Sequence, residues 1–538
     1  MERFDVIIVG AGSAGSVLAE RLSADGRRRV LVLEAGGRDR SPWIHLPVGY
    51  GKLFHHPHLN WRHRTEPQEA LAGRRDYWPR GRVTGGSGAI NALVYCRGLA
   101  SDFDDWSAAG AAGWGWADVA PVFERLETHV ARDGARRGAG RIHVTDVSGA
   151  VHPVNRHFFA ALRALQLPVT DDINGPAAEG GAVYRLNTRG GRRCGSGQAH
   201  LRPALRRRNL ALRTGALAER VLIEDGRAAG VVYRRHGARH EARAGQVILA
   251  AGAVRSPQLL QLSGIGPGAL LAGHGIAPIL DNPNVGGHLQ DHLAIDYAFR
   301  AREPTLNDVL RPWHGKARAA LRYALCRGGP LALSVNQCGG FFRSAPERAR
   351  PDQQLYFNPV TYTTMRSGRR TVIHPDPFPG FVIAAQPARP TSRGRIDIRG
   401  PDPHDAPAIR PNALATEADR AAAVDGIRLV RRIMAAPPLA CLADAAIGPD
   451  LRTIGDEAAM LEDFRARAAT VYHPVGTCRM GADPSSAVTD PRCRVFGVAG
   501  LRVIDASAFP NVTSGNTNAP TMMLADRAAD LFLEDLRA

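Results

Sequence analysis

Three glycines near the start of the chain have the spacing of a pyrophosphate-binding turn. Gly10, Gly12 and Gly15 form a G-x-G-x-x-G motif. In this motif the first glycine makes the tight turn, the second lets the backbone approach a phosphate and the third lets a helix pack on a strand. Glu34 lies about 20 residues further on, where a carboxylate can accept a hydrogen bond from a ribose hydroxyl. Because an acid here disfavours a 2′-phosphate, the residues predict a site for NAD or FAD rather than NADP.

The elements around these residues are those that a dinucleotide site requires. The run from Phe4 to Val9 is apolar and rich in β-branched residues, which is typical of a buried parallel strand. Residues 16–22 have helical apolar spacing, and a second strand from Val30 to Leu33 ends at Glu34. A lone motif of this kind occurs by chance in a chain with 58 glycines. Here strand, glycines, helix, strand and acid come in order, which predicts a βαβ unit whose helix N-terminus holds the phosphates.

The charge of the chain is strongly positive but diffuse. The formal net charge is +18 over 538 residues, and the basic residues are almost all arginine, with lysine only at Lys52 and Lys316. They form no stripe with interleaved aromatic residues, so the pattern argues against a nucleic-acid face. Such a potential can still steer anionic partners or membranes.

The cysteines and the first residues bear on the compartment. Seven cysteines form no C-x-x-C pair, which argues against a disulfide framework and against a zinc or other metal site, and suits a reducing compartment. The nucleotide-binding strand begins within four residues of the start, so we expect no signal peptide. No apolar run approaches the length of a transmembrane helix. We therefore expect a cytoplasmic protein without an integral membrane segment, either a monomer or a homodimer.

Several later stretches, like residues 4–34, contain small residues, apolar strands or helix starts. Gly81 to Gly98 is dense in small residues, which fits close approach to a flat ligand and equally fits a plain glycine-rich turn. Residues 247–253 form an apolar strand, after which Ser256 is expected to cap a helix and Pro257 to begin it. Residues 501–505 form another strand, and Pro520 is expected to precede a helix over 521–536. These stretches predict further strands and helices beside the nucleotide.

The middle of the chain is different. From residue 304 to residue 463, strand-like runs alternate with proline-rich turns, and one long helix is expected over 417–434. We therefore expect these residues to form a second domain built on an antiparallel sheet. Earlier in the chain, residues 224–227 have the composition of a turn between two strands.

Six of these stretches together resemble the glucose–methanol–choline (GMC) family of flavin-dependent oxidoreductases, with choline dehydrogenase-like alcohol dehydrogenases and oxidases among its members. The run over 285–292 resembles the family sequence V-G-x-N-L-Q-D-H, with His288 in place of the usual Asn. In the first signature, Thr84 replaces an aliphatic residue and Gly88 replaces Ser or Thr. The similar stretches are 10–15 with Glu34, 81–98, 252–266, 285–292, 472–481, and 503–507 through 516–521.

The resemblance implies a fold of α/β plus α+β class. It implies a Rossmann-like FAD-binding domain made of residues 1–155, 195–303 and 464–538. A substrate-binding domain of residues 156–194 and 304–463, with an antiparallel sheet, interrupts it. The resemblance also selects FAD over NAD.

The resemblance further implies a set of cofactor-binding residues. Members that bind flavin covalently carry a histidine near the position of Ile90, and isoleucine cannot form that bond, so we expect non-covalent FAD. The expected FAD-binding residues are Gly10, Gly12, Ser13, Ala14, Gly15, Glu34, Ala35, Val83, Gly86, Ser87, Asn91, Ala92, Leu93, Val94, Val221, Ala250, Gly252, Asp505, Ala506, Asn516, Thr517 and Asn518.

Alcohol oxidation by flavin requires a base for the hydroxyl proton, and histidine is the usual solution near neutral pH. Among 19 histidines, His473 lies in the motif that resembles the family's catalytic base. The position of its family partner matches Asn516, whose amide can orient the hydroxyl without competing for the proton. A structural histidine and a helix-capping asparagine are the alternative interpretations of these two residues.

The expected reaction is oxidation of a primary alcohol of modest size to the aldehyde, with oxygen or a quinone-like compound as electron acceptor. The sequence does not separate choline from aliphatic or aromatic alcohols. An alternative is an FAD-containing hydroxynitrile-type lyase of the same fold. A third interpretation is an arginine-rich nucleic-acid binder.

Overall fold

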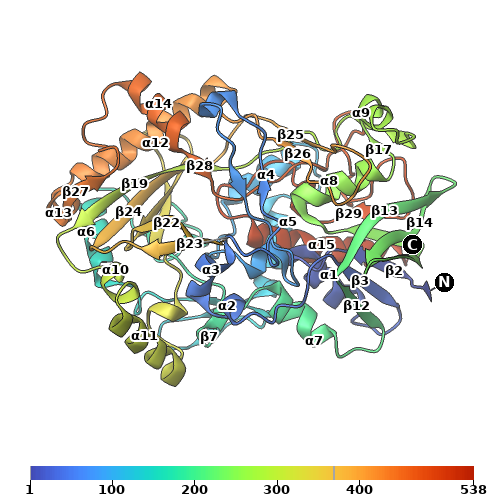
Figure 1. Ribbon diagram of the computed structural model, residues 1–538, viewed down its shortest axis with the longest axis horizontal. Coiled ribbons are helices and arrows are strands. Elements are labelled where there is room, and N and C mark those ends of the chain that lie inside the picture. The colour runs from blue at the N-terminus through green and yellow to red at the C-terminus, as the bar shows by residue number, and fades with distance from the viewer. Residues whose placement is uncertain (1, 368–369, 538) are drawn as a thin grey trace.

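A five-stranded parallel sheet forms the right half of the molecule in the computed structural model, which describes residues 2–367 and 370–537 (Figure 1). Two of its central strands are buried along their whole length and are apolar except for Glu34, because both faces of the sheet are covered. All neighbouring strands are parallel. The order is β12 (Leu210–Thr214), β3 (Val30–Glu34), β2 (Val6–Val9), β16 (Gln246–Leu249) and β29 (Leu501–Val503).

Helices α1 (Ser13–Leu22) and α15 (Asn518–Asp535) pack together on one face of this sheet. Ile8 points into the core that they share, whereas the next residue along the strand alternates to the other face, as side chains of a strand do. Arg21 of α1 forms an ion pair with Asp526 of α15 at 2.8 Å. The first and last helices of the chain are thereby held side by side.

The opposite face of the parallel sheet is covered by a second layer. It contains the hairpin of β13 (Ala216–Glu224) and β14 (Arg227–Arg235), together with α8 (Gly252–Leu262). The turn residues Asp225 and Gly226 have φ of 49° and 71°, the left-handed values of a tight hairpin turn. The predicted turn at 224–227 is therefore confirmed.

A six-stranded antiparallel sheet forms the other half of the molecule. Phe357 and Phe381 point from it into a core closed by α12 (Glu417–Ala435), α6 (Arg156–Ala164), α13 (Pro437–Leu442) and α14 (Glu457–Arg467). The strands are β20 (Cys338–Phe342), β21 (Gln353–Asn358), β24 (Gly380–Pro387), β19 (Leu293–Ala301) and β27 (Ala443–Ile447), with β28 (Ala469–Thr470) paired to β19.

Shorter elements lie around and between the two sheets. Residues 41–80 make two short helices, α2 (Pro42–His45) and α3 (Tyr50–Leu53), and the strand pair β4 (His63–Arg64) and β5 (Tyr77–Trp78). In the part of the chain that the structure describes, no helix has the length and apolar content of a membrane span. The other elements used below are β6 (Glu127–Val130), β8 (Ile142–Thr145), α9 (Gly268–Gly273), α10 (Leu306–Leu310), α11 (Trp313–Cys326), β22 (Tyr362–Ser367) and β23 (Arg370–Pro375).

The predicted fold class is confirmed, whereas two predicted helix starts are wrong. Helix α8 begins at Gly252, so that Ser256 and Pro257 lie inside it. The chain turns directly from β16 into α8 because Gly252 takes a φ of 84°, a value that favours glycine. Helix α15 begins at Asn518, which places Pro520 within its first turn, where a missing N–H costs no helical bond. The two sets of domain boundaries stay a prediction.

Candidate active site

A cavity of about 950 Å³ is lined by residues of both sheets. The carboxyl ends of β2 and β3 contribute Val9 and Leu33, and the antiparallel sheet contributes Tyr356, Asn358 and Ala384. The crevice at the carboxyl ends of parallel strands is where ligands bind in open α/β sheets. The alternation of β21 explains the second wall, because Phe357 points into the core while its two neighbours face the cavity.

The glycines allow two backbone segments, residues 10–15 and the segment of Gly86, to meet at this cavity. A Cβ on Gly86, whose φ is 54°, would lie 2.7 Å from the Cα of Gly12. A Cβ on Gly15 would lie 1.9 Å from the carbonyl oxygen of Gly10. Such distances exclude side chains, so the backbone itself forms this part of the wall.

Two helices begin at the cavity without a side-chain cap. Helix α1 starts after Gly12 and α15 after Thr517, and neither residue caps its helix with a side-chain hydrogen bond. The hydroxyl of Ser13 donates to Oδ1 of Asn518 at 2.7 Å and joins the two helix starts. Free N–H groups and the positive dipole ends suit negative groups of a ligand, such as a pyrophosphate. This cradle fits the elongated, anionic shape of FAD.

Glu34 is buried at the edge of the cavity and braces the glycine turn. Its Oε2 accepts from the N–H of Ala11 at 2.9 Å, and its Oε1 accepts from the N–H of Gly36 at 2.8 Å. Burial raises the pKa of this carboxyl to about 7, although the two amide hydrogen bonds oppose the rise.

The cavity gathers most of the residues predicted to bind FAD. Gly15, Val83 and Val221 lie outside its wall. Val83 is buried in a small core with Ile44, and Val221 is buried in the core of β13. The predicted residues in the wall are Gly10, Gly12, Ser13, Ala14, Glu34, Ala35, Gly86, Ser87, Asn91, Ala92, Leu93, Val94, Ala250, Gly252, Asp505, Ala506, Asn516, Thr517 and Asn518, together with His473.

Sequence reasoning missed other residues of the wall. Ala216, Leu217 and Ala218 line it because β12, which precedes them, pairs with β3, the strand that carries Glu34. No local signal reports that pairing. Arg80 also lines the cavity, and its buried position lowers its pKa to about 10.

His473 and His292 face each other with their Nδ1 atoms 3.0 Å apart. The Nε2 of His292 lies 2.8 Å from the carbonyl oxygen of Ala388, which can only accept a hydrogen bond. His292 therefore carries its proton on Nε2 and presents a lone pair at Nδ1. The Nδ1 of His473 must donate to that lone pair, which leaves the lone pair of neutral His473 on Nε2.

Burial keeps both imidazoles neutral. The pKa of His473 lies well below its ordinary value because of burial, assisted by His292 and Arg80. Burial likewise lowers the pKa of His292 to about 4. At neutral pH the unprotonated Nε2 of His473 is thus available as a proton acceptor.

Asn516 lies next to that nitrogen. Its Nδ2 is 3.1 Å from Nε2 of His473, so the amide donates to the lone pair. Its Oδ1 is buried and has no hydrogen-bond partner among the described residues. An amide in this position has a free acceptor and a second N–H for a ligand hydroxyl.

The backbone around His473 is fixed from two sides. The N–H of His473 donates to Oδ1 of Asp291 at 2.7 Å. The preceding residue, Tyr472, has a φ of 72°, and Nη2 of Arg80 donates to its carbonyl oxygen at 2.6 Å. A left-handed tyrosine is costly and persists only where the surroundings hold it. Asp291 and Arg80 are the polar groups that do so here.

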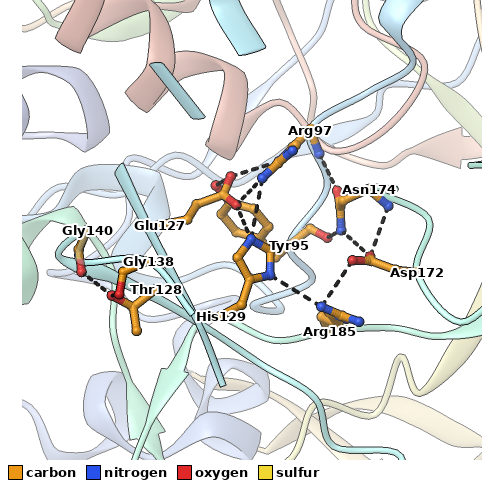
Figure 2. A network of polar contacts seen from close by, with 10 residues as sticks. All are labelled: Tyr95, Arg97, Glu127, Thr128, His129, Gly138, Gly140, Asp172, Asn174 and Arg185. Atoms are coloured by element: carbon orange, nitrogen blue, oxygen red, sulfur yellow. Dashed lines mark hydrogen bonds and ion pairs between the residues drawn. The ribbon is translucent and has the colours of Figure 1, made fainter. Parts of the chain in front are cut away.

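A buried polar network surrounds Tyr95 and Arg97 (Figure 2). Glu127 accepts from the hydroxyl of Tyr95 at 2.5 Å and from Nε of Arg97 at 2.9 Å, and it lies 2.7 Å from Nε2 of His129. Asn174 accepts from the N–H of Arg97 at 2.7 Å and donates to the carbonyl of Tyr95 at 3.2 Å. The network fixes the segment on both sides of residue 96.

The side chain of Cys96 then packs against the asparagine loop. A Cβ on Gly515 would lie 2.3 Å from the sulfur of Cys96, so glycine alone permits this contact. Asn516 follows directly and is positioned by the same packing.

Known proteins are similar to this chain along nearly its whole length. The family model described as GMC oxidoreductase matches residues 4–294 with its N-terminal part and residues 390–525 with its C-terminal part. An alcohol dehydrogenase [acceptor] of Pseudomonas putida is 41% identical over 536 residues, which cover 98% of this chain and 96% of that protein. An oxygen-dependent choline dehydrogenase of Rhizobium etli is 39% identical over 98% of this chain and 95% of its own length.

A solved structure shares the same architecture. The crystal structure of pyridoxine 4-oxidase from Mesorbium loti superimposes with a TM-score of 0.87 at 31% identity, covering 98% of this chain and 99% of that one. The chain therefore belongs to the GMC oxidoreductase family. Within it, the chain is an FAD-dependent enzyme that acts on the CH–OH group of alcohols.

Proposed function

We propose that this enzyme oxidises a primary alcohol to the aldehyde, with His473 as the base that takes the hydroxyl proton. The observation that carries the proposal is the hydrogen-bond chain from the carbonyl of Ala388 through His292 to His473, which fixes the tautomer of each imidazole. It leaves one lone pair, on Nε2 of His473, at the wall of the cavity and beside Asn516. A general base must be unprotonated and within hydrogen-bond reach of the hydroxyl group, and the lowered pKa of His473 keeps its imidazole unprotonated at neutral pH.

His473, Asn516 and His292 have different roles at the hydroxyl group. Nε2 of His473 accepts the proton, and Nδ2 of Asn516 donates a hydrogen bond to the alcohol oxygen. Nδ1 of His292 accepts from His473 and so stabilises the imidazolium that forms. FAD, when bound, supplies the chemistry of hydride acceptance from the alcohol carbon.

The residues that hold FAD follow from the shape of the wall. The backbone at Gly10, Gly12 and Gly86 and the start of α1 would hold the pyrophosphate, with Glu34 near the adenosine ribose. The start of α15 would stabilise negative charge on the ring system.

We propose that FAD is bound without a covalent bond. Ile90 lines the cavity at the position where covalent relatives have histidine, and its side chain has no nucleophile. Acid or heat denaturation is expected to release all of the flavin into the supernatant. Flavin that stays with the denatured chain would contradict the proposal.

We propose a substrate of modest size and either oxygen or a quinone-like compound as the acceptor. The relatives named alcohol dehydrogenase [acceptor] and oxygen-dependent choline dehydrogenase support both parts. The apolar and aromatic wall from Tyr356, Val360 and Tyr362 suits an aliphatic or aromatic alcohol.

Anaerobic mixing of the purified enzyme with a panel of primary alcohols tests the reaction. Bleaching of the flavin absorbance with at least one alcohol is expected, and readmission of oxygen then separates an oxidase from a dehydrogenase. A hydroxynitrile-type lyase would cleave its substrate without bleaching. Cleavage of a hydroxynitrile with no bleaching by any alcohol would contradict the proposal.

We also propose the two discontinuous domains bounded at residues 155, 194, 303 and 463, a cytoplasmic location, and a monomer or homodimer. Limited proteolysis, cell fractionation and light scattering test these three points in turn.

A further inference from the structure

Helix α11 has a large apolar face that is mostly exposed. Trp313, Leu321 and Leu325 are 80%, 60% and 79% exposed. Ala317, Ala320 and Ala324 are exposed as well. An apolar stripe of this size in water is a mark of an interaction surface.

This stripe lies opposite to the face by which α11 packs on the protein. With 3.6 residues per turn, Trp313, Leu321 and Leu325 fall on one side of the helix, and Gly315 and Ala319 fall on the other. The latter two are the buried residues of the helix. A Cβ on Gly315 would lie 2.3 Å from the carbonyl oxygen of Val309, so the helix lies directly on the end of α10. Because the opposite side of the helix packs on α10, the apolar side chains point outward.

The flanks of the stripe are basic. Lys316 lies on one side of it, and Arg318 and Arg322 lie on the other. None of the three forms an ion pair with a described residue, and all three are exposed. The sequence contains no Asp or Glu from residue 309 to residue 346. The face thus has an apolar centre and uncompensated positive edges.

The same helix borders the mouth of the cavity. Lys316 and Ala320 line the cavity and are exposed, and so are Lys52 of α3 and Tyr362 and Thr364 of β22. Helix α11 projects at the lower left of the molecule, next to these elements (Figure 1). Whatever binds α11 therefore lies at the entrance to the site.

We propose that α11 docks the enzyme on an anionic lipid bilayer, with the mouth of the cavity against the lipid surface. A helix with tryptophan and leucine on one face and Lys and Arg beside them is typical of an element that lies in the membrane interface. Anionic headgroups complement the unpaired basic side chains. The proposal concerns binding alone and does not rest on the proposed chemistry.

Co-sedimentation of the FAD-loaded enzyme with vesicles tests the proposal. We expect binding to phosphatidylcholine vesicles that contain phosphatidylglycerol, weak binding to phosphatidylcholine alone, and release by salt. L321Q/L325Q and R318A/R322A are each expected to weaken binding at least about tenfold, because they remove apolar burial and charge attraction, respectively. The matched controls are I279Q, at a residue 54% exposed beyond α9, and R206A/R208A, at two exposed arginines; both should bind like the parent protein.

Lysine labelling reports the orientation of the bound enzyme. The chain has only two lysines, and both lie at the mouth of the cavity. Amine-reactive labelling of Lys316 is expected to fall when anionic vesicles are added and to recover in L321Q/L325Q. Flavin content and alcohol-dependent bleaching without vesicles should be unchanged in both double variants, which shows that they are folded.

Three outcomes would overturn the proposal. The first is a parent enzyme that does not bind anionic vesicles. The second is binding that survives both α11 variants. The third is a self-associated enzyme that becomes monomeric in L321Q/L325Q, since a second copy of the chain would then cover the face.

Discussion

The Nδ1 atoms of His292 and His473 lie 3.0 Å apart with their rings perpendicular. Two imidazole nitrogens at this distance share one proton, and the carbonyl of Ala388 determines which ring provides it. The proton belongs to His473. The carbonyl of Ala388, acting through His292, therefore places the lone pair of His473 on Nε2.

Replacement of His473 by alanine should remove the base and keep the cofactor. The proposed cradle for FAD is formed by backbone and by the starts of α1 and α15, none of which depends on this side chain. We expect the H473A enzyme to be yellow and to reduce its flavin about 10²- to 10⁴-fold more slowly. Anaerobic stopped-flow absorbance measures the rate, with H143A, a buried histidine of β8 outside the cavity, as control. Near-normal reduction by H473A would exclude its role as base.

Because His292 contacts Nδ1 of His473, the effect of replacing His292 should depend on the chemistry of the new side chain. Leucine cannot accept the Nδ1 proton of His473, and H292L frees the ring to take the wrong tautomer. Glutamine can accept with Oε1 and donate to Ala388 with Nε2. We expect flavin reduction to slow by about 10- to 100-fold in H292L and to recover in part in H292Q, with little change of KM. Equal rates in the two variants would indicate a packing role only.

The sequence predicted the elements that have local signals. The apolar runs at Val6 and Val30, the turn at Asp225 and the periodicity of α12 each specify their structure from neighbouring residues. The predicted helix start at Ser256 failed because the positive φ of Gly252 starts the helix earlier, and the hydroxyl of Ser256 instead donates to Asp505.

Contacts between residues that lie far apart in the sequence could not be predicted from local patterns. His292 belongs to a motif that was recognised, yet its link to His473 depends on two segments far apart in the sequence. Ala216 reaches the cavity through the pairing of β12 with β3, whereas Val221, chosen instead, points into the core. The exposed face of α11 has an ordinary composition and becomes visible only when its buried side is known.

Gly86 should be essential for holding FAD. A Cβ there would lie 2.7 Å from Gly12, and alanine disfavours the φ of 54°. We expect G86A to purify with less than about a tenth of the parent's flavin, because the two backbone segments must separate. The control is G273A, since a Cβ on Gly273 has nothing within 4 Å. The ratio of flavin absorbance to protein absorbance measures occupancy, and full occupancy in G86A would contradict the expected contact.

The rate of flavin reduction should begin to fall at a lower pH than it would with a histidine of ordinary pKa as the base. The proposed proton abstraction needs neutral His473, and burial, His292 and Arg80 hold the pKa of this histidine well below 6.5. As the pH falls, the neutral fraction declines only once the pH approaches this lowered pKa. The limiting rate at saturating alcohol should therefore be flat from about pH 8 through about pH 6.5 and fall at more acidic values.

The charge of Arg80 provides the internal test of this pH profile. Because the guanidinium lowers the pKa of His473, R80Q should move the acidic limb to higher pH, toward the ordinary histidine value. The same substitution on the surface, R206Q, should leave the profile unchanged. Flavin reduction at a series of pH values, measured by stopped-flow absorbance, compares the three proteins. If the acidic limb of the pH profile lies at the same pH in R80Q as in the parent, the titrating group is not His473. The positive charge of Arg80 lowers the pKa of that imidazole, so its removal must shift the limb.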